Sequence, residues 1–180
     1  MWAAPPGRAL LMSLVLREWD PLLPLRAGVA VADLAGGAAV VKWPNDVLLG
    51  GGKLAGVLVE ARPSEWAVLG IGVNVAVDLA SLPDDVRSRA ATLGRPVSAL
   101  EPTLRELLAL LERRLAEPTA ACLAALRARD ALLDRPVHWA GGSGTGAGID
   151  DSGALLVRRD NGALVTLDAG EVHLGGSIPT

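Results

Sequence analysis

The sequence predicts an α+β fold, in which a sheet packed with helices is followed by a small all-β unit. Up to residue 134, apolar runs of strand length alternate with glycine turns and with segments of helical periodicity. After residue 134, five short apolar runs separated by glycines occupy about forty residues, a spacing typical of a small barrel. We therefore expect two domains, residues 1–134 and residues 135–180.

Composition and charge exclude several classes of protein. Hydrophobic residues make up 51% of the 180 residues, so a buried core can form and general disorder is excluded. The net charge of −3 and the lack of a basic block argue against nucleic acid as a partner. No run approaches the ~18 apolar residues of a membrane-spanning helix, so no membrane association is expected.

The N-terminal run does not have the form of a secretory leader. Arg8 precedes the apolar run Ala9–Leu16, but that run is only eight residues long and leads into the charged Arg17 and Glu18. The single cysteine, Cys122, cannot form an internal disulfide, which suits a reducing compartment. We therefore expect a cytoplasmic protein.

The first predicted elements are a strand and a helix. We expect Ala9–Leu16 to form a buried strand. A helix should begin near Pro24, because the missing N–H of proline would be unpaired in a first helical turn anyway. It should run to about Ala35 and stop at Gly36 and Gly37. Its apolar face would comprise Leu25, Val29 and Ala32.

A β-hairpin should follow. The runs Val47–Leu49 and Leu54–Val59 flank the glycines Gly50–Gly52, whose tolerance of positive φ suits a tight turn. A short strand, Val40–Trp43, should deliver the loop Pro44–Asp46 to the start of this hairpin, since proline keeps the residue before it out of helical backbone.

Rare residue types gather around this hairpin. Of the 17 basic residues, 15 are arginine, and only Lys42 and Lys53 are lysine, a compact point charge with three donors. The chain holds three asparagines, and Asn45 and Asn74 are two of them. This concentration indicates a functional constellation.

The run Trp66–Val77 should be a nearly continuous apolar strand that contains Gly70 and Gly72. Glycines inside a strand weaken it and usually mark a close approach by a ligand or by backbone. Asn74 lies near the end of this strand, and its amide needs hydrogen-bond partners there. Either the backbone of a neighbouring loop or a ligand could supply them, and the two glycines favour a ligand.

Two helices should complete the first domain, after a stretch from 78 to 95 that is loop with a helical turn or two. Thr103 and Glu106 have the T-x-x-E form of a capping box, which would open an amphipathic helix that runs to about Ala116. Its buried stripe would comprise Leu104, Leu107, Leu108 and Leu111. After Pro118, a second helix should run from about Ala120 to Leu133, with Cys122 buried on it.

The second domain should consist of five short strands, at Val137–Ala140, Ala147–Ile149, Ala154–Arg158, Ala163–Leu167 and Val172–Leu174. The glycine-rich run Gly141–Gly148 has no P-loop lysine and no following helix, so we interpret it as a hairpin loop. His138 and His173 fall on predicted strands without a third ligand nearby in the sequence, so we expect half-exposed sheet positions and no metal site.

Three segments of the first domain resemble the catalytic domain of biotin–protein ligases: KWPND at 42–46, KLAGVLVE at 53–60 and GIGVN at 70–74. The entry W-x-x-P-x-G that begins at Trp2 also occurs in this family, and the resemblance extends to the last predicted strand. It implies a mixed sheet of the class II synthetase-like, biotin/lipoyl ligase type, followed by a Src-homology-3-like barrel. It also implies the activity. Biotin and ATP form biotinyl-5'-AMP, and biotin then passes to a lysine of a biotin carboxyl carrier domain of a carboxylase.

The resemblance implies a role for each residue of the constellation. Lys53 would contact the biotin carboxylate and the α-phosphate, where a fixed ammonium offsets the repulsion between two anions. Asp46 would orient the acceptor lysine. Biotin would be lined by Lys53, Gly56, Leu58, Gly70 and Gly72, and the two glycines of GIGVN would also reach the adenylate. ATP or the adenylate would be bound by Lys42, Asn45 and Asn74. Magnesium would lie near Asn45, without a site made by protein alone.

Structural roles without ligand contact stay open for two of these residues: Lys42 could be a solvated charge at a strand end, and Asp46 could make a turn-stabilising contact. Two other functions also stay open, a non-catalytic remnant that binds nucleotide or a protein partner, and a lipoyl ligase or transferase on the same fold. The lysines of KWPND and KLAG favour biotin. A homodimer is compatible with the resemblance, and a DNA-binding repressor is not expected because no helix-turn-helix precedes the catalytic stretch.

Two departures from the family pattern limit the expected activity. Gly175 stands where the family often has a basic residue that faces the nucleotide. The sequence also begins where the family's Gly/Arg-rich loop, which closes over the adenylate, should end. We therefore expect the 180 residues alone to be inactive or weakly active, and expect the reading frame upstream of Met1 to encode such a loop.

Overall fold

The computed structural model describes residues 4–62 and 65–175, so the expectation for Trp2 lies outside the described residues. The first of its two sheets has five strands: β1 (Ala9–Leu16), β2 (Ala39–Lys42), β3 (Asp46–Leu49), β4 (Gly52–Arg62) and β5 (Trp66–Asn74). Their order is β1-β5-β4-β3-β2. All four strand pairings are antiparallel. The parallel component of the expected mixed sheet is confined to isolated bridges, such as Lys53 to Ala90.

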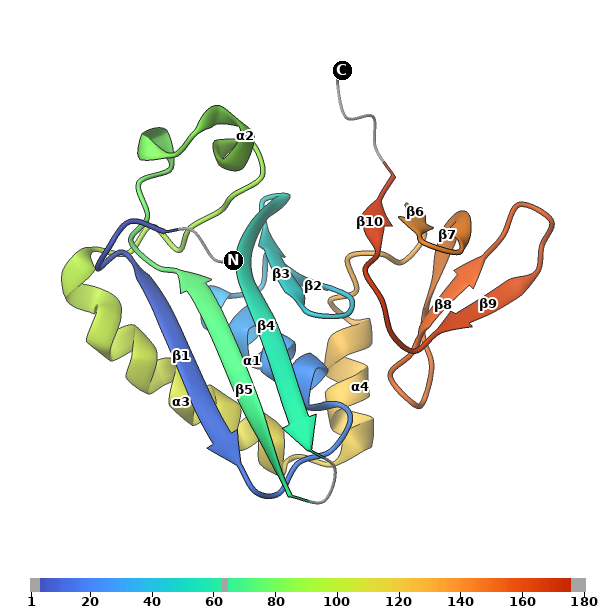
Figure 1. Ribbon diagram of the computed structural model, residues 1–180, viewed down its shortest axis with the longest axis horizontal. Coiled ribbons are helices and arrows are strands. Elements are labelled where there is room, and N and C mark those ends of the chain that lie inside the picture. Colours follow the sequence, from blue (N-terminus) through green and yellow to red (C-terminus); the bar gives the residue numbers. More distant parts are fainter. Residues whose placement is uncertain (1–3, 63–64, 176–180) are drawn as a thin grey trace.

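Three helices pack on one side of this sheet. They are α1 (Leu23–Ala35), α3 (Leu100–Ala116) and α4 (Thr119–Arg127). In Figure 1, α1 and α3 lie behind the strands, and α4 packs beside α1. The core lies between this helical layer and the sheet, where Leu23, Val29, Leu54 and Leu69 are almost completely buried. The side of the sheet that faces the viewer in Figure 1 carries none of these helices.

Strand β1 is at the edge of the sheet and is only half-buried, so the expectation of a buried strand is wrong. Its residues alternate between the core side and the open side of the sheet. Leu11 and Val15 on the open side are 63% and 70% exposed. The sequence was misleading because an apolar run does not reveal whether the second face of the strand is covered by other elements.

Helix α3 confirms its predicted end but not its predicted start. The helix begins at Leu100, after a short 3-10 helix at Val97–Ala99, so Thr103 lies inside it rather than at its cap. The Thr103 hydroxyl is buried and accepts a hydrogen bond of 2.9 Å from Arg95. Leu107 and Leu111 form the buried stripe as predicted, but Leu108 is exposed.

The other helical predictions are confirmed in part. Helix α1 begins and ends within one residue of the expected bounds, and Cys122 is buried on α4. Helix α4 ends at Arg127, six residues before the expected Leu133. The stretch before α3 contains a 3-10 turn at Leu79–Ser81 and the single-turn helix α2 (Asp84–Arg87), as expected of a loop with a helical turn or two.

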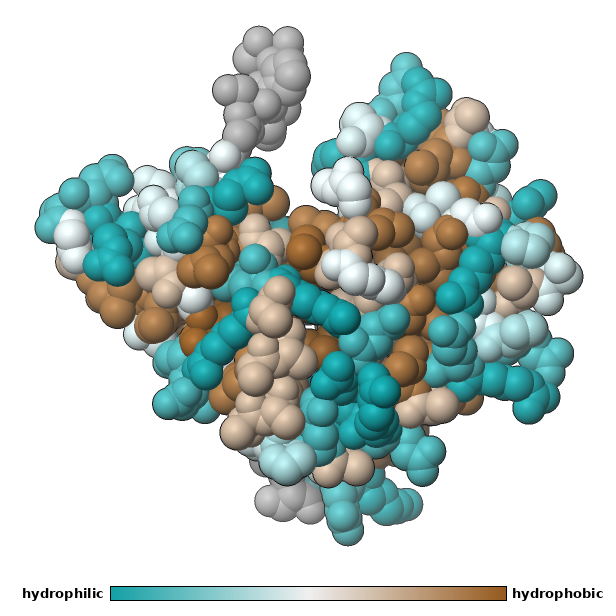
Figure 2. Space-filling model, turned by 180° about the vertical axis from the view of Figure 1, so that it is seen from behind, coloured by the Kyte–Doolittle hydropathy of each residue, from teal (hydrophilic) through white to brown (hydrophobic). Residues whose placement is uncertain are grey.

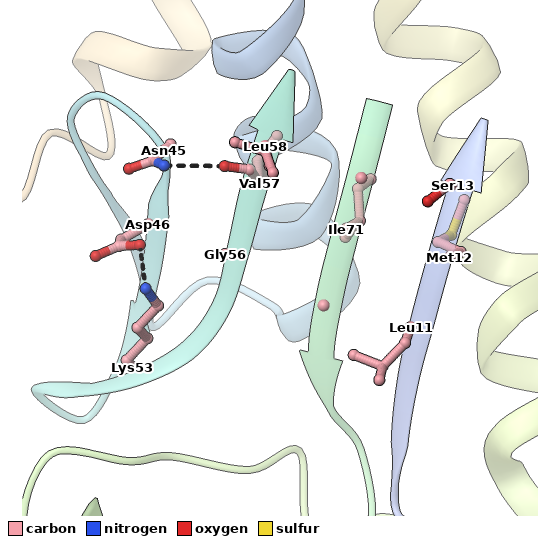
Figure 3. Close-up of a pocket in the computed structure, with 12 residues that line it drawn as sticks. Leu11, Met12, Ser13, Asn45, Asp46, Lys53, Gly56, Val57, Leu58 and Ile71 are labelled. Atoms are coloured by element: carbon pink, nitrogen blue, oxygen red, sulfur yellow. Dashed lines mark hydrogen bonds and ion pairs between the residues drawn. The ribbon is translucent and has the colours of Figure 1, made fainter. Parts of the chain in front are cut away.

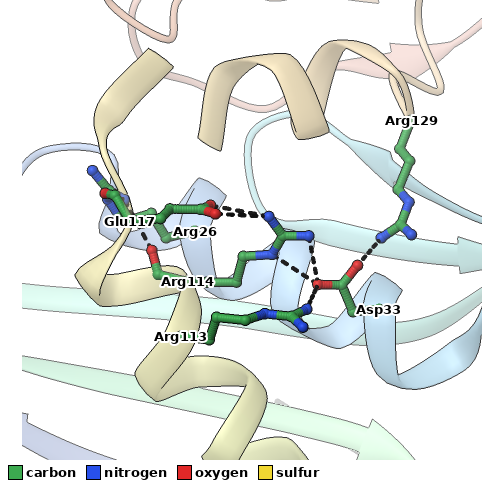
Figure 4. Close-up of polar contacts among 6 residues, drawn as sticks. All are labelled: Arg26, Asp33, Arg113, Arg114, Glu117 and Arg129. Atoms are coloured by element: carbon green, nitrogen blue, oxygen red, sulfur yellow. Dashed lines mark hydrogen bonds and ion pairs between the residues drawn. The ribbon is translucent and has the colours of Figure 1, made fainter. Parts of the chain in front are cut away.

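Charged side chains hold the three long helices together. Asp33 on α1 is only 10% exposed, and its carboxylate pairs with Arg113 and Arg114 of α3 and with Arg129, just beyond α4 (Figure 4). Figure 2 shows this side of the molecule, where hydrophilic side chains gather over the helices. No helix among the described residues is long and apolar enough to cross a membrane.

The second sheet is all-β, as predicted. It contains β6 (Pro136–Trp139), β7 (Gly142–Ile149), β8 (Leu155–Arg158), β9 (Leu164–Leu167) and β10 (His173–Leu174) in the order β10-β6-β7-β8-β9. The described strand pairings are those of an open antiparallel sheet, and its closure into a barrel stays a prediction. A division of the chain at residue 134 likewise stays a prediction.

The glycine-rich run 141–148 is the one segment of this sheet whose structure differs from the expectation. Most of it forms strand β7 instead of a hairpin loop. Its glycines allow close approach by other backbone. A Cβ on Gly144 would lie 2.5 Å from the carbonyl oxygen of Arg158, and a Cβ on Gly146 would overlap the carbonyl oxygen of Leu132. These two glycines therefore allow close packing of neighbouring backbone segments and do not form a turn.

Candidate active site

The open side of the first sheet is hollowed at its centre. The hollow has a volume of about 490 Å³ and is bordered by residues of β1, β3, β4 and β5 (Figure 3). Its lining residues include all the expected biotin ligands, Lys53, Gly56, Leu58, Gly70 and Gly72, together with Asn45 and Asp46. The structure therefore brings together residues that lie up to 27 positions apart in the sequence.

Glycines form the floor of this hollow. Gly72 of β5 pairs with Gly56 of β4 on one side and with Leu11 of β1 on the other. One row along, Gly70 pairs with Leu58 and with Ser13. The central strand thus presents bare backbone, while side chains of the two neighbouring strands border it.

The packing of the protein does not require a glycine at position 70. A Cβ at this position would meet only the carbonyl oxygen of Leu58 at 3.6 Å and its Cβ at 3.8 Å, which are ordinary contacts. The absence of a side chain therefore leaves open space above the sheet rather than relieving a clash. Such space suits the close approach of a ligand to the strand.

An ion pair lies at the polar end of the hollow. The Lys53 Nζ is 2.6 Å from Asp46 Oδ1, and the Lys42 Nζ is 3.4 Å from Asp46 Oδ2. The side chains of Lys42 and Asp46 are each only 15% exposed, so Lys42 is not a solvated strand-end charge. The carboxylate of Asp46 pairs with both lysines, and its role toward the acceptor lysine stays a prediction.

Asn45 is bonded to β4 by two hydrogen bonds. Its side-chain Nδ2 donates to the carbonyl oxygen of Val57 at 2.9 Å, and the Val57 N–H donates to the Asn45 carbonyl oxygen at 2.8 Å. Figure 3 shows the amide oxygen of Asn45 on the side away from Val57. That oxygen therefore points away from β4, where it can act as a hydrogen-bond acceptor.

Lys53 and Asp46 also border two further hollows, of about 270 and 550 Å³, which together form a polar crevice. Both are lined by Lys42, Lys53 and Asp46 together with residues of the C-terminal sheet or of the segment before β10. The smaller one includes Glu171, and the larger one includes Arg89 and His173. The ion pair thus lies where a glycine-floored hollow meets a crevice rich in charge.

Asn74 is held by backbone. The residue is 7% exposed, and its side-chain Nδ2 donates to the carbonyl oxygen of Ala91 at 2.9 Å and, more weakly, to that of Lys53 at 3.5 Å. The structure therefore supplies the loop-backbone partners that were one of the two alternatives for this residue. Asn74 also lines the larger crevice, and its contact with a nucleotide stays a prediction.

Several residues of the site were missed by the sequence analysis. Leu11 and Ser13 of β1 border the glycine floor, and Glu171 and Arg89 border the crevice. Ser13 carried a signal, since it is the one polar residue in the apolar run Ala9–Leu16. Arg89 and Glu171 had no such signal, because the sequence around a charged loop residue does not indicate which distant site that residue borders.

The two histidines lie at exposed positions of the second sheet, and Gly175 packs against the same sheet. His138 and His173 lie opposite each other on β6 and β10 and are exposed, and the described residues contain no group of three or more His, Cys, Asp or Glu side chains that could hold a metal. A Cβ at Gly175 would lie 2.9 Å from His138 Nε2 and 3.2 Å from the carbonyl oxygen of Pro136, so packing favours glycine there.

The chain is similar to known proteins over both of its parts. Residues 1–78 match the model of the Biotin/lipoate A/B protein ligase family, and residues 142–175 match that of the Biotin protein ligase C terminal domain. A biotin–[acetyl-CoA-carboxylase] ligase of Mycobacterium tuberculosis is 36% identical, with 96% of this chain and 72% of the relative covered. One of Paracoccus denitrificans is 37% identical, with 76% of this chain covered.

Solved structures share the fold. A biotin protein ligase of Aquifex aeolicus matches with a TM-score of 0.77 at 25% identity, covering 93% of this chain and 83% of that one. The same ligase in complex with biotin and ATP matches with a TM-score of 0.75 at 25% identity, covering 94% and 79%. The chain spans 63% of the length of the Paracoccus relative and 33% of a bifunctional ligase/repressor of Bacillus subtilis. These likenesses give no support to the expectation that the 180 residues alone are inactive.

Proposed function

Because this chain belongs to the biotin protein ligase family, as its match with the mycobacterial ligase shows, we propose that it activates biotin with ATP and transfers biotin to a lysine of a carrier domain. The observation that carries this proposal is the position of the Lys53–Asp46 ion pair. It lies between a glycine-floored hollow, which suits an apolar ligand that ends in a carboxylate, and a charged crevice, which suits a polyphosphate.

In the first step, a carboxylate oxygen of biotin attacks the α-phosphorus of ATP, and pyrophosphate leaves. The product is biotinyl-5'-AMP, a mixed anhydride. Two anions must approach each other, and the ammonium of Lys53 offsets their repulsion, most strongly as charge builds in the transition state. Asp46 holds Lys53 in place beforehand, at 2.6 Å. Lys42 and the amide oxygen of Asn45 face the phosphate side.

In the second step, the amine of the carrier lysine attacks the acyl carbon of the anhydride, and AMP leaves. The attacking amine must be neutral, so a proton has to be lost on the way. Asp46 is a carboxylate that lines both hollows, and it orients the incoming lysine once Lys53 has turned to the substrate. The acceptor is the biotin carboxyl carrier domain of a carboxylase, as the names of the relatives suggest.

Magnesium fits the site only together with the polyphosphate. This ion usually binds through one or two protein oxygens plus substrate phosphates and water. In the described parts of the chain, no group of three or more His, Cys, Asp or Glu side chains could hold a metal without substrate oxygens. With the polyphosphate bound, Asn45 Oδ1 and the Asp46 carboxylate are the protein oxygens that would hold the ion. When bound, it would neutralise phosphate charge.

Biotin is favoured over lipoate as the substrate. The family that matches residues 1–78 includes both kinds of ligase, but the domain that matches residues 142–175 is named for biotin protein ligases. Retention of the two lysines in a chain that otherwise uses arginine argues against a non-catalytic remnant.

The test is an exchange assay. Labelled pyrophosphate should enter ATP only when biotin is present, and labelled biotin should then appear on a carrier domain. Lipoate in place of biotin is the control for substrate class. The assay is run on the 180 residues and on the product of the whole reading frame, which also decides whether the 180 residues alone are inactive or weakly active. No biotin-dependent exchange in either protein would overturn the proposal.

A further inference from the structure

The side chain of Lys53 lies on a face of β4 that simple strand alternation would not give it. Gly56 and Leu58 face the hollow, while Ala55 and Val57 are buried in the core. Strict alternation would place Leu54 on the hollow side and Lys53 in the core. Instead, Leu54 is fully buried, and Lys53 borders the hollow.

A β-bulge causes this reversal. Val47 of β3 pairs with Ala55 of β4, but the next residue, Leu48, pairs with Lys53, so Leu54 is an extra residue without a partner in β3. A bulge of this kind shifts the alternation by one position and re-aims the residues on one side of it. The bulge is therefore the reason that a lysine, rather than a leucine, reaches the ion pair with Asp46.

The backbone of Lys53 is bonded by a segment from outside the hairpin. Its N–H donates to the carbonyl oxygen of Arg89 at 2.7 Å, and its carbonyl oxygen accepts from the N–H of Ala91 at 2.9 Å. Lys53 and Ala90 form an isolated parallel bridge. At the position where the hairpin ladder is interrupted, residues 89–91 thus act as a short added strand.

Two residues keep this added strand in place. The Asn74 side chain donates to the Ala91 carbonyl oxygen at 2.9 Å from the neighbouring strand β5. Gly52 lets the segment approach, because a Cβ there would lie 2.5 Å from the carbonyl oxygen of Ala90 and 2.7 Å from its carbonyl carbon. Gly50 and Gly51 have positive φ and form the turn, whereas Gly52 does not, so its glycine serves this approach instead.

We propose that residues 89–91, seated on Gly52 and held by Asn74, are a positioning element that stabilises the bulge at Leu54 and thereby aims Lys53 at the reacting groups. None of these residues need touch the substrate for this role. The consequence for the reaction rests on the proposed function, whereas the consequence for the position of Lys53 does not.

The test is Gly52→Ala, with Gly50→Asn as the matched control. The alanine Cβ must push the backbone of Ala90 away. The control alters the same turn at a residue with φ of +59° and no atom within 4 Å of an added Cβ, and asparagine visits that left-handed backbone more readily than most residues. Folding of each variant is checked by circular dichroism and urea unfolding.

The readout uses the fact that the chain has only two lysines. Reductive dimethylation with formaldehyde, followed by peptide mass spectrometry, gives the modification rate of Lys53 relative to Lys42. In Gly52→Ala this ratio should change by about fivefold or more, and in Gly50→Asn by less than twofold. In a protein that is active, the kcat of biotin-dependent exchange should fall about tenfold in Gly52→Ala, with the KM for ATP within about threefold.

The possible outcomes separate the two proposals. An unchanged Lys53/Lys42 ratio in folded Gly52→Ala would overturn the positioning role, whatever the activity. A wild-type protein without exchange would count against the proposed function only, since the labelling ratio is still measured. If Gly52→Ala does not fold, Asn74→Asp takes its place, because a carboxylate cannot donate to the Ala91 carbonyl oxygen. For that variant, an altered ATP KM with an unaltered labelling ratio would refute the positioning role.

Discussion

The indole Nε1 of Trp43 donates a buried hydrogen bond of 3.0 Å to the carbonyl oxygen of Gly153. Trp43 precedes the loop that carries Asn45 and Asp46, and Gly153 lies in the turn between β7 and β8. Gly153 has a φ of +88°, and a Cβ there would overlap Leu22 and lie 2.9 Å from Leu25. The C-terminal sheet is therefore joined directly to the loop of the candidate active site.

Trp43→Phe should lower the free energy of unfolding by about 1 to 3 kcal/mol, because it leaves the buried carbonyl oxygen of Gly153 without its donor. The measurement is urea unfolding at pH 7. Trp66→Phe is the control, since Trp66 lies at the partly exposed end of β5, and it should change the free energy by less than about 1 kcal/mol. Equal losses in both variants would show that the hydrogen bond to Gly153 is not what matters.

Lys53→Ala should lower the rate of biotinyl-5'-AMP formation by about 10² to 10³, the usual scale for the loss of one charge that stabilises a transition state. Lys53→Arg should not rescue fully, because the guanidinium fork is bulkier and its donors point differently. Biotin-dependent ATP–pyrophosphate exchange measures both. An exchange rate within twofold of wild type in Lys53→Ala would show that this ammonium is not catalytic.

Asp46→Asn should slow the transfer of biotin from preformed biotinyl-5'-AMP more than it slows adenylate formation, if Asp46 orients the acceptor lysine. Single-turnover measurements of the two half-reactions make the comparison. Loss of the 2.6 Å ion pair with Lys53 gives adenylate formation some sensitivity too. Equal losses in both steps would assign Asp46 to Lys53 or to magnesium instead of to the acceptor.

Gly70→Ala should fold normally and bind biotin poorly. The new Cβ meets only ordinary contacts in the protein but occupies the floor of the hollow. We expect the KM for biotin to rise about tenfold or more, while the free energy of unfolding stays within about 1 kcal/mol of wild type. Gly37→Ala is the matched control, since an added Cβ there has no atom within 4 Å and lies away from the hollow. An unchanged biotin KM in Gly70→Ala would place biotin elsewhere.

Asp33 should make stability depend on pH in the acid range. Burial by itself raises the pKa of Asp33, but hydrogen bonds from Arg114 and Arg129 outweigh it, so the pKa in the folded chain lies below its ordinary value. A lowered carboxyl pKa contributes stability that is fully present above the unfolded pKa, near 4, and is lost as the pH falls through the folded pKa.

Asp33→Asn should therefore cost about 2 kcal/mol at pH 7, because it leaves the partly buried arginines without their anion. The difference from wild type should shrink as the pH falls below about 4. Urea unfolding from pH 7 to pH 3 measures it. Asp151→Asn is the control, since that carboxylate is 97% exposed and an exposed pair contributes little. A difference that does not vary with pH would show that ionisation of Asp33 is not the source of the stability.

The sequence by itself determined the elements whose signals are local. The glycine turn between β3 and β4, the helix that begins near Pro24, and the order of KWPND, KLAG and GIGVN all depend on residues a few positions apart. Such signals reflect backbone preferences and side-chain periodicity, which act within one element. They were sufficient to predict the order of strands and helices, whereas the roles expected of Lys53 and Asp46 came from the resemblance to biotin–protein ligases.

The tertiary structure decided the features that depend on contacts between distant segments. The bulge at Leu54 is what brings Lys53 rather than Leu54 to the hollow, and the partners of Asn74 come from a loop seventeen residues away. The glycines of β7 looked like a loop but serve close backbone packing against Leu132 and Arg158. Periodicity cannot reveal these cases, because a bulge, a covered strand face or a close backbone approach is set by whichever segment packs alongside.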